Sequence, residues 1–239
     1  MVIKISNLNK SYKNLKVLDG LNLHIKKGSI FGLLGANASG KTTLISILNY
    51  LIPKNSGEIT IDGYNFDKDN KKIKEISAYV PQTYAFYLTL TTYENLEFFG
   101  ALYGLKKPQL AERINYCIEA TSLEKFRNKP AYTYSGGVKR RLNIAIGLLN
   151  KPKILYLDEP TVGIDPQSRK FILDGIKNIN KENDTTIIYT SHYMEEVEYL
   201  CDEIAILDNN KIILHQNMCF GNKNLEQLFL SLTKEHLRD

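Results

Sequence analysis

The feature that most constrains this chain is a nine-residue segment lying between an apolar run and a helical pattern. The segment matches the phosphate-binding pattern G-x-x-x-x-G-K-[S/T] and consists of Gly35, Ala36, Asn37, Ala38, Ser39, Gly40, Lys41, Thr42 and Thr43. Residues 29–34 before it predict a buried strand, and residues 42–51 after it predict a helix that Pro53 stops. In such a strand–loop–helix unit, backbone N–H groups and the positive end of the helix favour a polyphosphate. We therefore expect Lys41 to contact the β- and γ-phosphates of a nucleotide and the Thr42 hydroxyl to bind Mg²⁺.

The composition is that of a globular protein, and the sequence argues against a membrane-spanning or a secreted protein. The chain has 239 residues, of which 43% are hydrophobic and 24% are charged, which is enough for one core with a subdomain. The net charge of +5 is mild and does not demand a nucleic-acid partner. No apolar run approaches the ~20 residues needed to span a bilayer, and residues 1–5 alternate like a strand rather than forming a signal peptide. Cys117, Cys201 and Cys219 are far apart and fit buried, reduced thiols in a cytosolic protein.

The periodicity divides the chain into a helical segment between two α/β segments. The first segment has predicted strands at 2–7, 21–25, 58–61 and 77–80. The helical segment has three predicted helices, which cover 92–105, 108–120 and 138–150. Thr91 and Glu94 predict a capping box at the start of the first. Pro108 opens the second, whose predicted apolar face consists of Leu110, Ile114, Cys117 and Ile118. The last segment has predicted strands at 154–157, 185–189, 204–207 and 212–214, and predicted helices from Pro166, over 194–200 and over 225–237. We therefore expect one domain, with an α/β core and β subdomain over 1–83 and 151–239 and a helical subdomain over 84–150.

Two carboxylates follow the apolar strand at 154–157. The carboxyl ends of parallel strands form the ligand-binding edge of an α/β sheet, which is where Asp158 and Glu159 would lie. We expect Asp158 to hold Mg²⁺ alongside Thr42, and Glu159 to polarise a water molecule against the γ-phosphate. A solvated acidic pair that caps the next turn is the alternative. The buried strand and the phosphate loop together favour the functional interpretation.

Three further side chains are candidates by their position. His192 follows the strand at 185–189 and is expected to donate a hydrogen bond to the γ-phosphate. Gln82 follows the strand at 77–80, and its amide oxygen is expected to complete the Mg²⁺ shell. Tyr12 precedes the phosphate loop and is expected to stack on adenine. The alternatives are a structural histidine, a solvated loop glutamine, and one more core or surface residue among fifteen tyrosines.

The order of these motifs resembles an ABC-transporter nucleotide-binding subunit over essentially the whole chain. The discriminating motif is Ser135-Gly136-Gly137 at a helix start after a helical insertion, although by itself it is also compatible with an ordinary helix cap after a flexible turn. Asp165, in the segment 163–165, resembles the D-loop of that family. The resemblance implies a P-loop NTPase (RecA-like) core with an N-terminal antiparallel β subdomain and an inserted α-helical subdomain.

The resemblance also implies partners and an activity. It implies a head-to-tail dimer with a second copy, in which each ATP contacts the phosphate loop of one subunit and Ser135, Gly136 and Gly137 of the other. It implies an ATPase that converts ATP and water to ADP and phosphate, with ATP and Mg²⁺ bound, and that drives transport through a separate integral membrane permease. Such a subunit is cytoplasmic and peripheral on the inner face of the cell membrane, and no nucleic acid is expected.

The chain departs from the family pattern at two motifs. The usual Gly-Pro-Asn-Gly is here Gly35-Ala36-Asn37-Ala38, and a positive φ at Ala38 would cost about 1 kcal/mol. Tyr134 and Val138 stand where the signature usually has Leu and Gln, which resembles ABC-2-type exporters, as does the tail at 228–233. The sequence does not indicate the cargo or whether the dimer has one or two kinds of chain.

Two other interpretations remain at this point. One is an ABC-type ATPase that acts on the ribosome or nucleic acid, but such proteins usually carry two cassettes or a long coiled-coil insert, and this chain has neither. The other is a non-hydrolysing regulatory subunit. Lys41, Glu159 and His192 argue against it.

Overall fold

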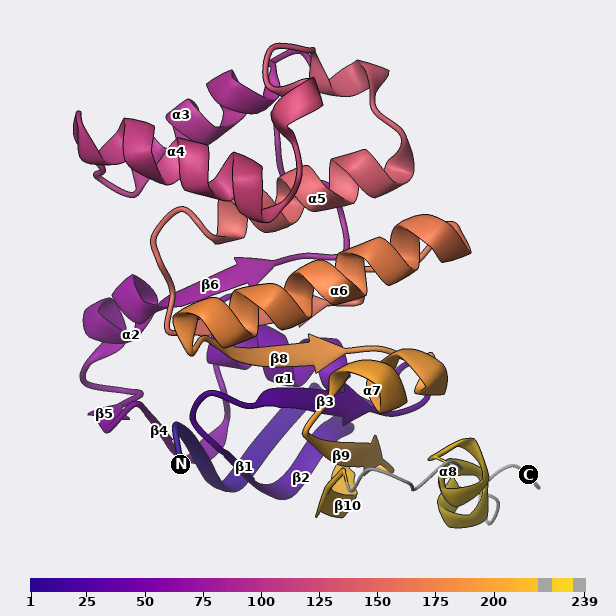
Figure 1. Cartoon of the computed structure of the whole chain (residues 1–239). Helices are drawn as coiled ribbons and strands as arrows, with labels where there is room; N and C mark the ends of the chain where they lie inside the picture. Colours follow the sequence, from indigo (N-terminus) through magenta and orange to yellow (C-terminus); the bar gives the residue numbers. More distant parts are fainter. Residues whose placement is uncertain (219–224, 234–239) are drawn as a thin grey trace. The chain divides into compact units, whose positions relative to one another are not determined.

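The computed structural model describes residues 1–218 and 225–233, and it divides into two compact units. The first unit contains residues 1–74 and the described residues from 186 onward, and the second contains residues 75–185 (Figure 1).

The first unit contains an antiparallel sheet with the strand order β2-β1-β4-β5. Its strands are β1 (Ile3–Tyr12), β2 (Leu15–Ile25), β4 (Ser56–Ile61) and β5 (Tyr64–Asn65). The strand predicted over 2–7 continues to Tyr12, and its pairing with β2 is irregular between Ile5 and Leu8. Such a bulge interrupts the two-residue alternation on which the prediction rested.

The first unit also contains the strand that leads into the phosphate loop. Parallel strands β8 (Thr186–Thr190) and β9 (Glu203–Asp208) pair with the two sides of β3 (Ile30–Leu34), and β10 (Lys211–Asn217) pairs antiparallel with β9. Every residue of β3 and β8 is buried, which explains why β3 is apolar throughout and why β8 has apolar and β-branched residues rather than an alternating pattern. The unit's helices are α1 (Lys41–Leu48), α7 (Met194–Leu200) and α8 (Leu225–Thr233). The predicted strand–loop–helix unit is therefore present.

The second unit combines a parallel strand pair with four helices. The strands are β6 (Ser77–Val80) and β7 (Ile154–Asp158), and the helices are α3 (Thr92–Leu102), α4 (Gln109–Ala120), α5 (Gly136–Gly147) and α6 (Pro166–Asn183). Two short 3₁₀ helices, η1 (Glu124–Phe126) and η2 (Ala131–Thr133), connect α4 to α5.

The helix starts in this unit follow local sequence signals. Glu94 N–H donates to Thr91 Oγ1 at 3.2 Å, and Thr91 N–H donates to Glu94 Oε2 at 2.8 Å, so the predicted capping box of α3 is confirmed. Helix α4 follows Pro108 as predicted. It buries the four predicted apolar residues, Leu110, Ile114, Cys117 and Ile118.

Some predicted elements differ from those in the structure, and others lie outside the described residues. Helix α2 (Asn70–Ile76) was not predicted, because its sequence lacks an apolar stripe and buries only Ile73. The helix expected over 138–150 begins earlier, at Gly136, and ends at Gly147.

Cys117 and Cys201 are buried thiols, and burial raises the pKa of Cys117 to about 12. Cys219 and the last residues of the helix expected over 225–237 lie outside the described residues. Within the part of the chain that is described, no helix is both long and apolar enough to cross a bilayer.

Candidate nucleotide-binding site

The backbone of the phosphate loop leaves no room for side chains at its first residue. A Cβ added to Gly35 would lie 2.4 Å from the Leu207 carbonyl oxygen and 2.4 Å from Ser39 Oγ. Gly40, the residue before α1, has φ 108°, and Ala38 has φ 64°. The expected positive φ at Ala38 is therefore present, with its cost of about 1 kcal/mol. These conformations fold the loop back over the start of α1.

The polar groups of the loop suit a bound polyphosphate. Lys41 is 5% exposed, and its Nζ donates to the carbonyl oxygens of Gly35 at 2.8 Å and Ala36 at 3.0 Å. Ser39 Oγ is buried and has no hydrogen-bond partner among the residues that the structure describes. Buried hydroxyls are normally satisfied, so this one fits a ligand oxygen. Thr42 is exposed on the first turn of α1, where its hydroxyl is accessible to a cation.

Tyr12 and His192 also belong to the first unit. Tyr12 is the last residue of β1, is 46% exposed, and has Lys10 Nζ 4.9 Å from its ring centroid. An exposed ring of this kind can accept a stacked base. His192 lies two residues after β8, half-buried, with its ring 4.2 Å from that of Tyr193.

A buried carboxylate that sequence reasoning missed supports the His192 segment. Glu196 Oε2 accepts hydrogen bonds from Tyr189 Oη at 2.6 Å and from Ser191 Oγ at 2.9 Å. Ser191 Oγ in turn accepts from the Tyr193 N–H at 3.0 Å. These bonds hold the backbone on both sides of His192. In the sequence, Glu196 is only one of several acids in a short helix.

The two carboxylates of the second unit are in different environments. Asp158 ends β7, is 4% exposed, and accepts a hydrogen bond from Tyr79 Oη at 3.2 Å. Burial, together with the Asp158 charge, raises the pKa of Tyr79 far above its usual value, so the phenol stays a donor that orients Asp158. Glu159 has φ 44°, in the left-handed region that non-glycine residues seldom adopt. Its Oε2 accepts from Gln82 Nε2 at 3.2 Å, so the structure brings these two candidates together.

The remaining candidates form the starts of two helices in the second unit. Ser135 precedes α5, and Gly136 and Gly137 are its first residues. A Cβ added to Gly137 would lie 2.8 Å from Ser168 Cβ, which belongs to α6. Asp165 precedes α6, and its Oδ1 accepts from the Ser168 N–H at 2.9 Å, which keeps the pKa of Asp165 below its usual value. Arg140 and Asn143 of α5, which were not predicted, bind the loop that contains Gln82.

A buried parallel strand, a glycine-dependent phosphate loop and a helix define the class of P-loop nucleoside triphosphatases. The family model described as ABC transporter matches residues 18–162. The chain therefore belongs to the ABC transporter family, as an ATP-binding cassette that hydrolyses ATP. The predicted family, fold class and ATPase activity are confirmed.

Two curated relatives show how the chain compares with whole proteins. It is 46% identical over 212 residues to the linearmycin resistance ATP-binding protein LnrL of Bacillus subtilis, covering 89% of this chain and 68% of that one. It is 37% identical to the human ATP-binding cassette sub-family A member 2, where the match covers 92% of this chain but only 9% of the relative. The chain therefore corresponds to a small part of the sub-family A protein.

Two solved structures share the fold. The structure of cbiO1 from Clostridium perfringens, part of the ABC transporter complex cbiONQ, has a TM-score of 0.85 at 28% identity and covers 99% of this chain and 95% of that one. The ATP-binding cassette MJ0796, in a dimeric post-hydrolysis state bound to ADP and Pi, has a TM-score of 0.80 at 26% identity, covering 91% of this chain and 99% of that one. The MJ0796 cassette, which has this fold, is therefore a dimer that binds the products of ATP hydrolysis.

Proposed function

We propose that this chain powers export through a separate integral membrane permease by hydrolysing ATP between two of its copies. The observation that carries the proposal is the phosphate loop, in which Gly35 admits no side chain, Lys41 is held inside, and Ser39 presents a buried hydroxyl. The likeness to LnrL, named a resistance ATP-binding protein, supports the export direction.

In this proposal the phosphate loop binds and orients ATP. The backbone N–H groups of residues 35–43 and the start of α1 bind the phosphates, and the Lys41 ammonium neutralises charge on the β- and γ-phosphates. Tyr12 stacks on adenine. The Thr42 hydroxyl, the Asp158 carboxylate and the Gln82 amide oxygen are hard oxygen ligands and would hold Mg²⁺, which supplies charge neutralisation at the phosphates.

Glu159 and His192 act on the γ-phosphate end. Glu159 polarises the attacking water, a general-base contribution that typically supplies 10²–10⁴-fold. Its hydrogen bond from Gln82 Nε2 supports this role, because the bond fixes the direction in which the carboxylate points. His192 donates a hydrogen bond to the γ-phosphate, and the Glu196 network supports the backbone around it.

The second half of each pocket comes from a second copy in a head-to-tail dimer. Ser135, Gly136 and Gly137 of one copy contact the ATP bound to the other, and Asp165 lies in the D-loop beside them. The exposed start of α5 supports this role, because it offers a hydroxyl and N–H groups at the positive end of a helix. The MJ0796 cassette, which was solved as a dimer, supports the formation of a dimer.

Residues 84–150 form the helical subdomain and dock on the permease. Aromatic residues of this segment are exposed, with Tyr84 at 41%, Tyr87 at 50% and Phe98 at 40%. The Tyr87 and Phe98 rings lie 5.1 Å apart and form one apolar patch. Exposed apolar patches mark interaction sites. Docking there would place the chain at the inner face of the membrane.

The first test removes the charge at the phosphates. Lys41→Ala should abolish phosphate release by the purified protein and weaken nucleotide binding, because no other cation of the loop replaces the ammonium. Lys27→Ala, in the turn before β3, is a matched control and should keep the wild-type rate. Wild-type turnover in the Lys41 variant would contradict the assignment.

The second test traps the dimer. Glu159→Gln should keep ATP binding but lose water activation, so sizing with Mg-ATP should show a dimer that the wild type forms only transiently. Glu182→Gln, an exposed change on α6, is the control and should behave like the wild type. A Glu159→Gln protein that remains monomeric with Mg-ATP would count against the shared pocket.

A third test concerns the membrane partner. Co-purification of this chain with a polytopic membrane protein would support the proposed permease.

A further inference from the structure

Two consecutive arginines of α5 bind different parts of the second unit. Arg140 is 3% exposed, and its Nη1 donates to the carbonyl oxygens of Pro81 at 3.2 Å and Gln82 at 2.8 Å. Its guanidinium carbon also lies 5.2 Å from the centroid of the Tyr84 ring. The planar guanidinium can bind two carbonyls and face an aromatic ring at once, which a lysine cannot do.

Asn143, three residues further along α5, binds the same loop. It is 3% exposed, and its Nδ2 donates to the carbonyl oxygens of Pro81 at 3.1 Å and Thr83 at 3.0 Å. Its Oδ1 accepts from the Ala85 N–H at 3.1 Å. Together, Arg140 and Asn143 bind the main chain of the loop 81–85 from its first residue to its last.

The two ends of this contact reach both halves of the proposed pocket. At one end, the Gln82 side chain donates to Glu159. At the other end, Tyr84 Oη donates to the Gly136 carbonyl oxygen at 3.4 Å, within the signature turn formed by Ser135, Gly136 and Gly137. Two side-chain hydrogen bonds, with the main chain of residues 82–84 between them, therefore join the start of α5 to the Glu159 carboxylate, the proposed general base.

We propose that Arg140 and Asn143 are positioning residues that make the loop 81–85 and the start of α5 move as one body. This inference rests on the proposed roles of Gln82, Glu159 and Ser135. Its consequence is that contact of the signature turn with the nucleotide of the second copy changes the position of Gln82 against Glu159. Hydrolysis is then tied to dimer formation by contacts within a single chain.

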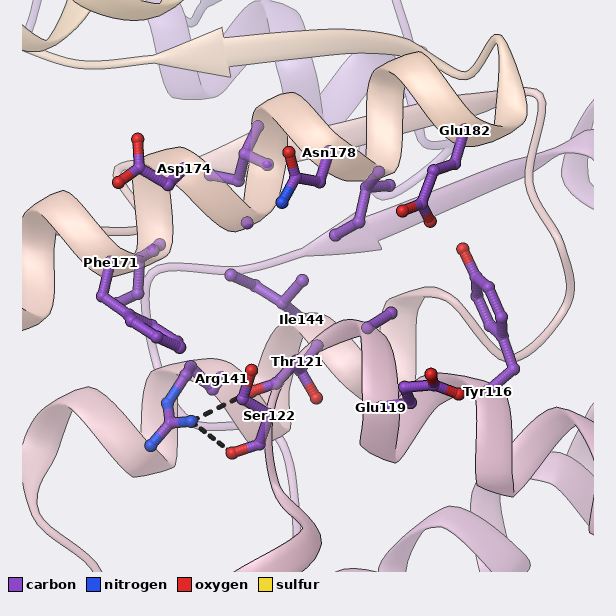
Figure 2. Close-up of a pocket in the computed structure, with 15 residues that line it drawn as sticks. Tyr116, Glu119, Thr121, Ser122, Arg141, Ile144, Phe171, Asp174, Asn178 and Glu182 are labelled. Atoms are coloured by element: carbon purple, nitrogen blue, oxygen red, sulfur yellow. Dashed lines mark hydrogen bonds between the residues drawn. The ribbon is translucent and has the colours of Figure 1, made fainter.

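Arg141 provides a matched control within the same helix. Its Nη1 donates to the carbonyl oxygens of Thr121 at 3.0 Å and Ser122 at 2.5 Å, and its guanidinium carbon lies 5.0 Å from the Phe171 ring centroid. It lines a cavity of about 470 Å³ between α4, α5 and α6 (Figure 2). Arg141 therefore makes the same kinds of contact as Arg140, but with the end of α4 rather than with the loop of Gln82.

The decisive experiment is a double-mutant cycle. Arg140→Gln and Arg141→Gln are each made in the wild type and in Gln82→Ala, and kcat, KM for ATP and Tm are measured. We expect Arg140→Gln to lower kcat about tenfold with KM for ATP unchanged, and to have little further effect once Gln82 is alanine, because coupled residues are not additive. Arg141→Gln should lower Tm by about as much as Arg140→Gln does, because both remove two hydrogen bonds to carbonyl oxygens. Its effect on kcat should stay below about twofold in both backgrounds.

Equal losses of kcat from Arg140→Gln in both backgrounds would overturn the proposal, and so would the same coupling to Gln82 in Arg141→Gln. If Arg140→Gln fails to fold, Arg140→Lys replaces it in the cycle with the same criteria.

Amide hydrogen exchange at Ala85 tests the same contact without activity. Asn143→Leu should speed exchange of the Ala85 N–H at least about tenfold, because this N–H loses its acceptor, while exchange in β7 stays unchanged. Unchanged protection of Ala85 would overturn the proposal. If the wild type releases no phosphate, the proposed function fails, whereas the exchange measurement still decides whether the loop is held by α5.

Discussion

Two helices of the second unit begin with almost the same backbone conformation but use their first residue differently. Ser135 before α5 has φ −65° and ψ 164°, and Asp165 before α6 has φ −62° and ψ 155°. Asp165 accepts a hydrogen bond from the Ser168 N–H, whereas the Ser135 side chain caps nothing among the described residues. Serine and aspartate are about equally good N-caps, so the residue type does not explain the difference.

The difference separates a helix start that supports the fold from one that is available to a ligand. At α6, an N–H group is satisfied within the chain. At α5, Ser135 and Gly136 are exposed, and the positive end of the helix faces solvent. Helices α4 and α7 also lack a side-chain cap, so a missing cap alone defines no site. At α5 the missing cap coincides with two glycines, one of which admits no side chain.

The largest expected effect comes from closing the space beside Gly137. In Gly137→Ala, the new Cβ would meet Ser168 Cβ and Oγ at 2.8 Å, which forces the start of α5 away from α6. A displacement of this kind at the proposed phosphate contact should lower kcat about 100-fold. The measurement is ATP turnover at saturating ATP. Adding Ser168→Gly removes both clashing atoms and should restore most of the activity, and a failure to do so would contradict the steric explanation.

The next effect separates binding from stability at the same helix start. Ser135→Ala should lower ATP turnover about 10- to 100-fold, because a hydroxyl that contacts a charged phosphate contributes about 1.5–3 kcal/mol. Its Tm should stay within about 1 °C of the wild type, because the side chain caps nothing in the described chain. A clear drop in Tm with normal turnover would show that Ser135 is an ordinary cap.

The elements that the sequence predicted are those with a strong local signal. The capping box at Thr91 and Glu94, the buried face of α4 and the glycine-rich loop each depend on residues close in sequence. The missed elements, α2 and β5, are short and lack a clear period. The positive φ of Ala38 was expected because glycine is usual at that position.

The candidate site was predictable where strands end and not where distant segments meet. Gln82 and Glu159 each follow a parallel strand, and neighbouring strands bring their ends together. Arg140 donates hydrogen bonds to carbonyl oxygens 58 and 59 residues away in the sequence. Glu196 is buried and accepts hydrogen bonds from two hydroxyl groups. In a helical sequence, such polar residues look like a solvated face, so only the packing of the segments identifies them.

A smaller effect is expected from removing the cap of α6. Asp165→Ala should lower Tm by roughly 2–4 °C, the usual effect of a lost N-cap in a chain of this size. The Ser168 N–H holds the pKa of Asp165 below its unfolded value. The stabilisation is therefore present above the unfolded pKa and is lost as the pH falls through the lower folded pKa.

Measuring Tm against pH checks the sign of this effect. The difference between wild type and Asp165→Ala should be full near pH 7 and should disappear in strong acid. Asp165→Asn keeps an acceptor that does not titrate, so its Tm difference from Asp165→Ala should persist at acid pH. A difference between wild type and Asp165→Ala that is independent of pH would exclude the carboxylate as the cap.

The smallest effect concerns the loop before a third helix, α1. The residue that precedes this helix is Gly40, which has no side chain to act as a cap, and Ala38 lies two residues before it. Ala38→Gly relieves a left-handed conformation that costs about 1 kcal/mol, but it adds chain entropy to the unfolded state. The Tm of Ala38→Gly alone should therefore change by less than about 2 °C. Ala36→Gly, two residues earlier and outside the left-handed region, carries only the entropic penalty and should lower Tm. The Tm difference between the two variants without nucleotide, roughly 2–4 °C, isolates the strain at Ala38. Equal Tm values would mean that the loop adopts its conformation without strain, and the cost assigned to Ala38 would then be wrong.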